Sequence, residues 1–166
     1  MAISESFLPE FDQETAKTRK TIERAPAGRW DWKPHDKSMT LGELTTHLAT
    51  ILSWAETTIK HDSFDLGTDP PKVKAAGSPA EALAAYDEHV RTARASIAGA
   101  SDETFMEKWS LRAAGNTFFS APKVSVLRSF VMNHMIHHRA QLGVYLRLND
   151  IPVPATYGPS ADEQMF

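Results

Sequence analysis

The 166-residue chain contains no cysteine, so it forms no disulfide and offers no thiolate as nucleophile or metal ligand. It also lacks a basic excess, because 18 lysines and arginines stand against 21 aspartates and glutamates, for a formal net charge of −3. This balance gives no support to a nucleic-acid partner or to an anionic membrane surface. Any metal ion would therefore be held by histidine, aspartate or glutamate, and any thiol chemistry would use a thiol brought in by a substrate.

Long apolar runs are missing as well. No stretch approaches the ~18 apolar residues that a transmembrane helix needs. The first five residues, Met-Ala-Ile-Ser-Glu, are neither basic nor followed by a long apolar segment, which argues against a signal or transit peptide. We therefore expect a cytoplasmic protein with no membrane partner. The length suits a single domain, 1–166, and no internal repeat or low-complexity segment divides it.

Four segments show the periodicity of amphipathic helices. Their start signals are clearest in the middle two: Thr40 and Glu43 have capping-box spacing, and Ser78-Pro79 places a cap residue before a proline at the first helical position. Four helices in one domain predict an all-α fold, a four-helix bundle in which the long second and third connections allow crossovers. The predicted helices span about residues 4–25, 40–61, 78–99 and 121–149.

The connections between these helices are less regular. Residues 62–77 are polar, with a pair of prolines at 70–71, and are predicted to form a long loop. A short turn is predicted at 101–104, and the Gly-Asn pair at 115–116 predicts either a small hairpin or an ordered loop. The C-terminal segment 151–166 carries three prolines and is predicted to be extended.

The most informative motif is Asn-His-Met-Ile-His-His-Arg at 133–139, inside the fourth predicted helix. At about 100° per residue, His134 and His138 fall one turn apart on the same face, whereas His137 lies towards its edge. A buried imidazole without a polar partner is costly, and two imidazoles four residues apart can reach one metal ion. The other residues on this face are apolar or aromatic: Leu127, Val131, Leu142 and Tyr145.

Two imidazoles rarely hold an ion alone, so a third ligand should come from a facing helix. Periodicity leaves two candidates open, His47 in the second predicted helix and His89 in the third. The alternative for each is an ordinary packed or surface histidine. His35 and His61 lie in or next to loops, and we expect no role for them.

Four segments of the chain match a known family pattern when they are taken together. They are an aromatic loop at 30–34, a first histidine motif at 38–48, the second histidine motif at 133–142, and the C-terminal stretch 151–163. Over nearly its whole length the chain thus resembles the DinB-like (DinB/YfiT-type) superfamily of four-helix-bundle metalloenzymes. The resemblance implies a metal triad of His47, His134 and His138, and so favours His47 over His89. It also implies a divalent ion, zinc or nickel, and a homodimer.

Some members of this superfamily use low-molecular-weight thiols such as bacillithiol or mycothiol. The resemblance therefore implies a metal-dependent thiol S-transferase or a hydrolase acting on small electrophilic substrates. Three imidazoles would leave an open position on the ion, which is typical of a catalytic site. One alternative is a non-catalytic metal- or small-molecule-binding stress-response protein, in which Arg139 and Gln141 are ordinary surface or interface residues. Another is a triad that holds no metal in the cell.

Several further residues are candidates for the surroundings of the triad. Glu43 precedes His47 by one turn, so it could orient that ring, although a role as helix cap is the alternative. The aromatic candidates, for which core packing is the alternative, are Trp30, Trp32, Trp54 and Tyr145.

Overall fold

The computed structural model describes residues 1–67 and 74–164, so the predicted proline pair at 70–71 lies outside the described residues. The helices are α1 (Ile3–Glu23), α2 (Leu41–Thr50), α3 (Ser53–Lys60), α4 (Pro79–Gly99), α5 (Asp102–Met106), α6 (Lys123–Val126) and α7 (His134–Leu148). A 3-10 turn, η1, spans Ala27–Arg29, and a π-helical segment, η2, spans Leu127–Asn133. The strands are β1 (Ser63–Asp65), β2 (Lys108–Ala113) and β3 (Asn116–Pro122). The described part is thus mostly helical, but the expectation of an all-α fold is incomplete because of this small sheet.

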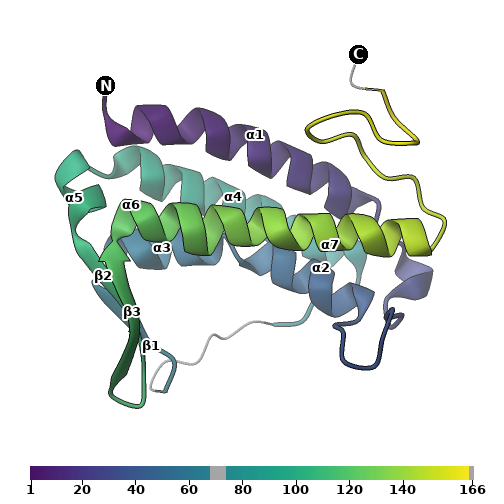
Figure 1. Ribbon diagram of the computed structural model, residues 1–166, viewed down its shortest axis with the longest axis horizontal. Helices are drawn as coiled ribbons and strands as arrows, with labels where there is room; N and C mark the ends of the chain where they lie inside the picture. The colour runs from purple at the N-terminus through teal and green to yellow at the C-terminus, as the bar shows by residue number, and fades with distance from the viewer. Residues whose placement is uncertain (68–73, 165–166) are drawn as a thin grey trace.

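The long helices lie alongside one another, with the sheet at one end (Figure 1). Helix α4 contacts α1, α2 and α3, and α7 contacts α1 and α2. The contact between α7 and α2 matters most for the site, because these two helices carry the two histidine motifs. None of the helices in the described residues is long and apolar enough to span a bilayer. Fully buried side chains between the helices include Phe7, Phe11, Leu44, Leu48, Tyr86, Ile97, Met135 and Leu142.

The second predicted helix is two helices, because the chain breaks at Ile51 and Leu52 between α2 and α3. Its predicted start is confirmed: the Thr40 hydroxyl accepts a hydrogen bond from the Glu43 amide at 3.1 Å, and the Thr40 amide donates to the Glu43 carboxylate at 2.7 Å. These reciprocal bonds satisfy two amides that a helix start otherwise leaves free. The capping box therefore sets the first residue of α2 and, with it, the position of His47 one and a half turns later.

The fourth predicted helix is a continuous rod in which α6, η2 and α7 follow one another. The central segment, Leu127–Asn133, has the wider π-helical turn, with hydrogen bonds between residues five apart. It ends directly before His134. A wider turn shifts the angular position of every side chain before it relative to those after it, so a single 3.6-residue period does not describe the whole rod.

A small sheet packs against one end of the helices. Strand β2 pairs in parallel with β1 and antiparallel with β3. The β2–β3 hairpin confirms the first of the two alternatives predicted for this region. Its connecting residues, Ala114 and Gly115, both have positive φ, at 48° and 81°, as two-residue hairpin turns with the strand-matching twist require. Strand β1, three residues long, falls in the region that we predicted to be a loop.

The loop between α1 and α2 is pinned to the helices by its first tryptophan. The Trp30 indole N–H donates to the Ala76 carbonyl at 3.0 Å, and the ring lies directly against Gly42 in the first turn of α2. A Cβ atom at position 42 would lie 2.5 Å from the indole nitrogen, so a residue with a side chain would push the ring away. As predicted for the C-terminal segment, the described residues 151–164 form neither helix nor strand.

Candidate metal centre

Three histidines from two helices converge between α2 and α7. One ring-nitrogen atom from each of His47, His134 and His138 lies within 4.8 Å of the other two. The ring centroids are 5.0 Å apart for His47 and His134, 4.5 Å for His47 and His138, and 4.7 Å for His134 and His138. The predicted pair one turn apart on α7 is therefore joined by His47, and the three residues are placed where they could hold one metal ion.

The closest approach in the cluster is between two nitrogen atoms. Nε2 of His47 lies 3.2 Å from Nε2 of His134. Two nitrogens bound to a tetrahedral zinc ion at ~2.0–2.1 Å would lie about 3.3–3.4 Å apart, so the spacing fits a shared ion. Without an ion, only one of the two nitrogens can carry the hydrogen of a hydrogen bond. The donor set, three imidazoles and no thiolate, suits a divalent transition-metal ion such as zinc, copper, iron or nickel.

His138 is held in a defined orientation by a neighbour on its own helix. Its Nδ1 lies 2.6 Å from Oε1 of Gln141, one turn later on α7. When Nδ1 is protonated it donates to this oxygen, and Nε2 is left with its lone pair free for an ion. Gln141 is exposed, as the non-catalytic alternative expects of a surface residue, but it also contacts His138 and so lies next to the site. Its spacing of three from His138 is a signal that the sequence contained.

The surroundings keep the three imidazoles uncharged. Burial, with smaller effects of the neighbouring His138 and His134, lowers the pKa of His47 to about 4. Burial also lowers the pKa of His134, against a hydrogen bond to the Phe130 backbone that raises it. Burial lowers the pKa of His138 as well, although the hydrogen bond to Gln141 opposes this effect. Since only the neutral ring can bind a metal ion through its lone pair, the cluster is ready for an ion at neutral pH.

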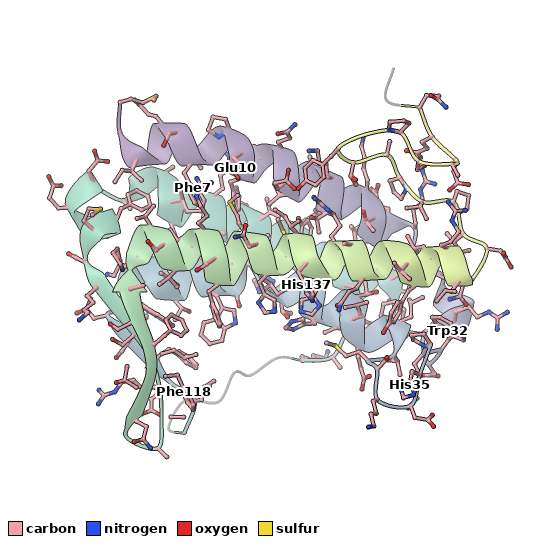
Figure 2. All side chains as sticks on the ribbon, viewed as in Figure 1. Phe7, Glu10, Trp32, His35, Phe118 and His137 are labelled. Carbon is pink, nitrogen blue, oxygen red and sulfur yellow. The ribbon has the colours of Figure 1, made fainter. Side chains whose placement is uncertain are left out.

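The three rings are not sealed from solvent. His47 and His134 are half-buried, and His138 is buried, with 8% of its surface exposed. His137, the predicted bystander, is exposed, and its ring lies 4.9 Å from that of His138. Figure 2 labels His137 midway along the helical body, between Phe118 at the sheet end and Trp32 at the loop end. The candidate centre therefore keeps partial contact with solvent.

The remaining histidines lie elsewhere. His89, the competitor for third ligand, has its Nδ1 2.9 Å from the Ala49 carbonyl at the end of α2, where it can satisfy that carbonyl beside the break between α2 and α3. His35 accepts a hydrogen bond from the Lys37 amide, and His61 follows the last residue of α3; both side chains are exposed.

Other residues named from the sequence divide between the site and the fold. Glu43 is exposed and caps the start of α2, so the structure shows it as a helix cap rather than as a residue that orients His47. Trp32 packs edge-on against Tyr145, with centroids 5.5 Å apart. Trp54 contacts Phe130, whose ring in turn lies 5.9 Å from that of His134.

Arg139 is buried inside the protein. The non-catalytic alternative had instead given it as an ordinary surface or interface residue. Only 3% of it is exposed, and its Nη2 lies 2.7 Å from Oε2 of Glu14, which is equally buried. The same nitrogen donates to the Tyr157 hydroxyl at 2.8 Å, and that hydroxyl donates to Glu14 at 2.6 Å. This network joins α1, α7 and the C-terminal segment. The sequence did not predict this network, because one arginine within an amphipathic helix pattern does not reveal partners elsewhere in the chain.

Comparison with solved structures places the same fold in two other proteins. A DinB-like protein from Bacillus cereus ATCC 10987 superposes with a TM-score of 0.72 at 19% identity, covering 94% of this chain and 98% of the other. A DinB-like protein from Bacillus subtilis superposes with a TM-score of 0.67 at 18% identity, covering 94% and 96%. Comparison with curated proteins gives no match. The sequence matches the DinB family over residues 1–165, so this chain belongs to the DinB family.

Proposed function

We propose that the protein is a four-helix-bundle, metal-dependent enzyme, a thiol S-transferase or hydrolase that acts on small electrophilic substrates. The single observation that carries the proposal is the meeting of His47, His134 and His138 with ring nitrogens within 4.8 Å of one another. Family membership and the lowered pKa of each imidazole support the same assignment. A homodimer and a cytoplasmic location remain predictions.

The access to the rings favours a catalytic over a structural ion. A structural zinc site is closed by four protein ligands, whereas a catalytic site keeps a position for water or substrate. Within the described residues, the cluster of possible ligands has three members, and two of them are half-buried rather than enclosed. A divalent ion held there would supply Lewis acidity, which lowers the pKa of a bound water or thiol.

The residues of the chain would then have separate tasks. The three imidazoles would hold the ion through neutral nitrogens, and the hydrogen bond of His138 Nδ1 to Gln141 would leave Nε2 as the nitrogen free to bind it. In the transfer reaction, a carbon–sulfur bond forms as the bond from that carbon to its leaving group breaks, and the thiol proton passes to solvent. Because the chain has no cysteine, no thiol of its own competes with the incoming one.

The test has a binding part and an activity part. Protein purified without an affinity tag is analysed for its metal content and titrated with zinc and nickel by calorimetry. Bacillithiol, mycothiol and glutathione are then assayed with a generic electrophile, with and without a chelator, in the wild type and in His138→Ala. We expect one ion per chain and chelator-sensitive turnover that the variant loses. Tight binding without turnover would support the non-catalytic alternative, and absence of binding would overturn the proposal.

A further inference from the structure

The triad borders on a cluster of aromatic rings that the proposed chemistry does not use. Phe130 lies one turn before His134, and the centroids of their two rings are 5.9 Å apart. Phe130 in turn contacts Trp54, at 5.3 Å, and Phe119, at 5.6 Å. Phe64 adds a fourth ring, 4.7 Å from Trp54. We call these four residues, Trp54, Phe64, Phe119 and Phe130, the aromatic wall.

Four different elements build the aromatic wall. Trp54 comes from α3, Phe64 from β1, Phe119 from β3 and Phe130 from the π-helical segment η2. Behind them lies Trp109 of β2, whose ring centroid is 5.8 Å from that of Phe119 and 6.5 Å from that of Phe130. The small sheet thus contributes two rings to the wall and one to its backing. Through these rings, the sheet at the end of the helices also contacts residues that lie next to the triad.

The aromatic wall packs against a core cluster of Trp109, Leu111 and Val126 but is more exposed than that cluster. Trp109 is 0% exposed, as expected of a ring that serves packing alone. The four wall residues are each only half-buried, so each keeps part of its surface in contact with solvent. Apolar surface left in water forgoes free energy that burial would supply, and a ligand that covered it would gain this free energy. The wall begins at Phe130, whose ring lies next to that of His134, which points to a ligand shared with the triad.

We infer that the aromatic wall binds an aromatic or other flat apolar group of the substrate, while the substrate's reacting part lies at the triad. This inference rests on the proposed function and adds a substrate class to it. A ring joined by one or two bonds to the atom held at the triad would reach Phe130 and pack against its edge or face. Offset and edge-on ring pairs of this kind are favourable beyond the area that they bury.

A pair of metal-binding probes that differ in one group tests this inference. Benzohydroxamate carries a phenyl ring and acetohydroxamate a methyl group on the same zinc-binding unit. The zinc-loaded protein is titrated with each, followed by calorimetry and by tryptophan fluorescence, to which Trp54 contributes. We expect benzohydroxamate to bind about tenfold more tightly, which corresponds to about 1.4 kcal/mol. Phe130→Leu should lose most of this preference while keeping its zinc affinity.

Phe118 provides a matched control. It directly precedes Phe119 on β3, at the bulge where β3 has one residue more than β2, and it is 66% exposed, so it lies outside the packed rings of the wall (Figure 2 labels it). Phe118→Leu should keep the full preference for the phenyl probe. Equal affinity of the two hydroxamates for the wild type, or an equal loss of preference in the two leucine variants, would overturn the inference.

A second probe keeps the two proposals separable. If zinc does not bind, the proposed function fails, and the hydroxamates lose their anchor. The metal-free protein is then titrated with 4-nitrobenzyl alcohol, whose ring quenches nearby tryptophan and which has no strong metal-binding group. Saturable quenching that Phe130→Leu weakens and Phe118→Leu leaves unchanged would support the aromatic wall without the metal. Unsaturable quenching, or equal quenching in all three proteins, would overturn it.

Discussion

Two successive residues of α7, His138 and Arg139, show how differently one helix treats its buried polar groups. Arg139 points towards α1 and the C-terminal segment, where Glu14 and Tyr157 supply close partners of matching charge and hydrogen-bonding type. His138 points towards α2, and its ring lies beside those of His47 on α2 and His134 on α7. On the Arg139 side of α7, the charge and the hydrogen bonds are satisfied by other residues of the protein. On the His138 side, three imidazoles lie together, and each has a nitrogen that can offer a lone pair.

The difference separates a polar group whose partners all lie within the fold from a group of imidazoles that could hold an ion. Burial by itself would raise the pKa of the Glu14 carboxyl, but hydrogen bonds from Tyr157 and Arg139 outweigh it and leave that pKa lowered. The carboxylate is thus stabilised as an ion by its partners. For His47, burial and the neighbouring imidazoles act in the same direction and suppress its charge. A cavity of about 400 Å³ adjoins the Arg139 side of α7, and none of the three histidines lines it.

The largest effect is expected from breaking the completed network. Arg139→Met would remove the fully buried cation of Glu14 and leave the carboxylate with Lys17, whose Nζ lies 3.2 Å from Oε1 of Glu14, at a cost of about 3 kcal/mol in the free energy of unfolding. Urea unfolding followed by circular dichroism measures this loss. The double variant Glu14→Leu/Arg139→Met should recover much of it, because an apolar pair of similar size needs no counter-charge. A loss below about 1 kcal/mol in the single variant would show that the pair is not essential to the fold.

The next effect concerns a ligand of the candidate centre. His138→Ala should weaken zinc binding more than about 100-fold, since even partners of metal ligands contribute 10–100-fold. The measurement is the rise in melting temperature on adding zinc, because a ligand that binds only the folded state stabilises it. His137→Ala, which removes the exposed neighbour, should keep the full rise. The same rise in both variants would exclude His138 as a ligand.

A smaller effect is expected one step away from the ion. Gln141→Leu removes the acceptor at Nδ1 of His138 and should weaken zinc binding by about 10–100-fold. Competition with a chelator of known affinity measures it. Gln141→Glu restores an acceptor and should bind zinc at least as well as the wild type. If the leucine variant binds as tightly as the wild type, the orientation of His138 does not depend on Gln141.

The smallest effect is a pH dependence of the metal-free protein. His47 has a pKa of about 4 in the folded chain, below its ordinary value of 6.5, so between these values the unfolded chain binds more protons. Stability should therefore fall as the pH drops from 6.5 to 4, by on the order of 1 kcal/mol from this residue. Melting temperatures recorded over this range test the sign. In His47→Asn the decline should be shallower, and an identical slope would contradict the assignment.

The helical parts of the fold and the histidine pair on α7 could be predicted because both rest on local spacing. Thr40 and Glu43 mark a helix start through contacts three residues apart, and His134 and His138 share a face through one helical turn. The third ligand was different. Angular position left His47 and His89 as equals, and only the family resemblance favoured His47, which the structure places beside the other two.

What could not be predicted depends on contacts between distant segments. Strand β1 has three residues and exists because it pairs with β2, whose partner residues lie 47 positions later. Arg139 looked like a surface residue because its partners, Glu14 and Tyr157, come from other parts of the chain. The break between α2 and α3 and the π-helical turn before α7 both leave the apolar pattern nearly unchanged. Periodicity therefore predicted one helix where each of these irregularities occurs.

The π-helical turn makes the rod from Lys123 to Leu148 two pieces with separate rotational settings. Phe130 lies within the π-helical segment, and the two histidines lie in α7 after it. A π-helical turn holds one residue more than an α-helical turn, so removing one residue within 127–133 would let the segment close into an ordinary α-helix while α6 and α7 keep their settings. Phe130 would then change its angular position and leave its neighbours on the sheet. Length changes at this one place are thus a direct means of re-aiming the ring while the histidines stay where they are.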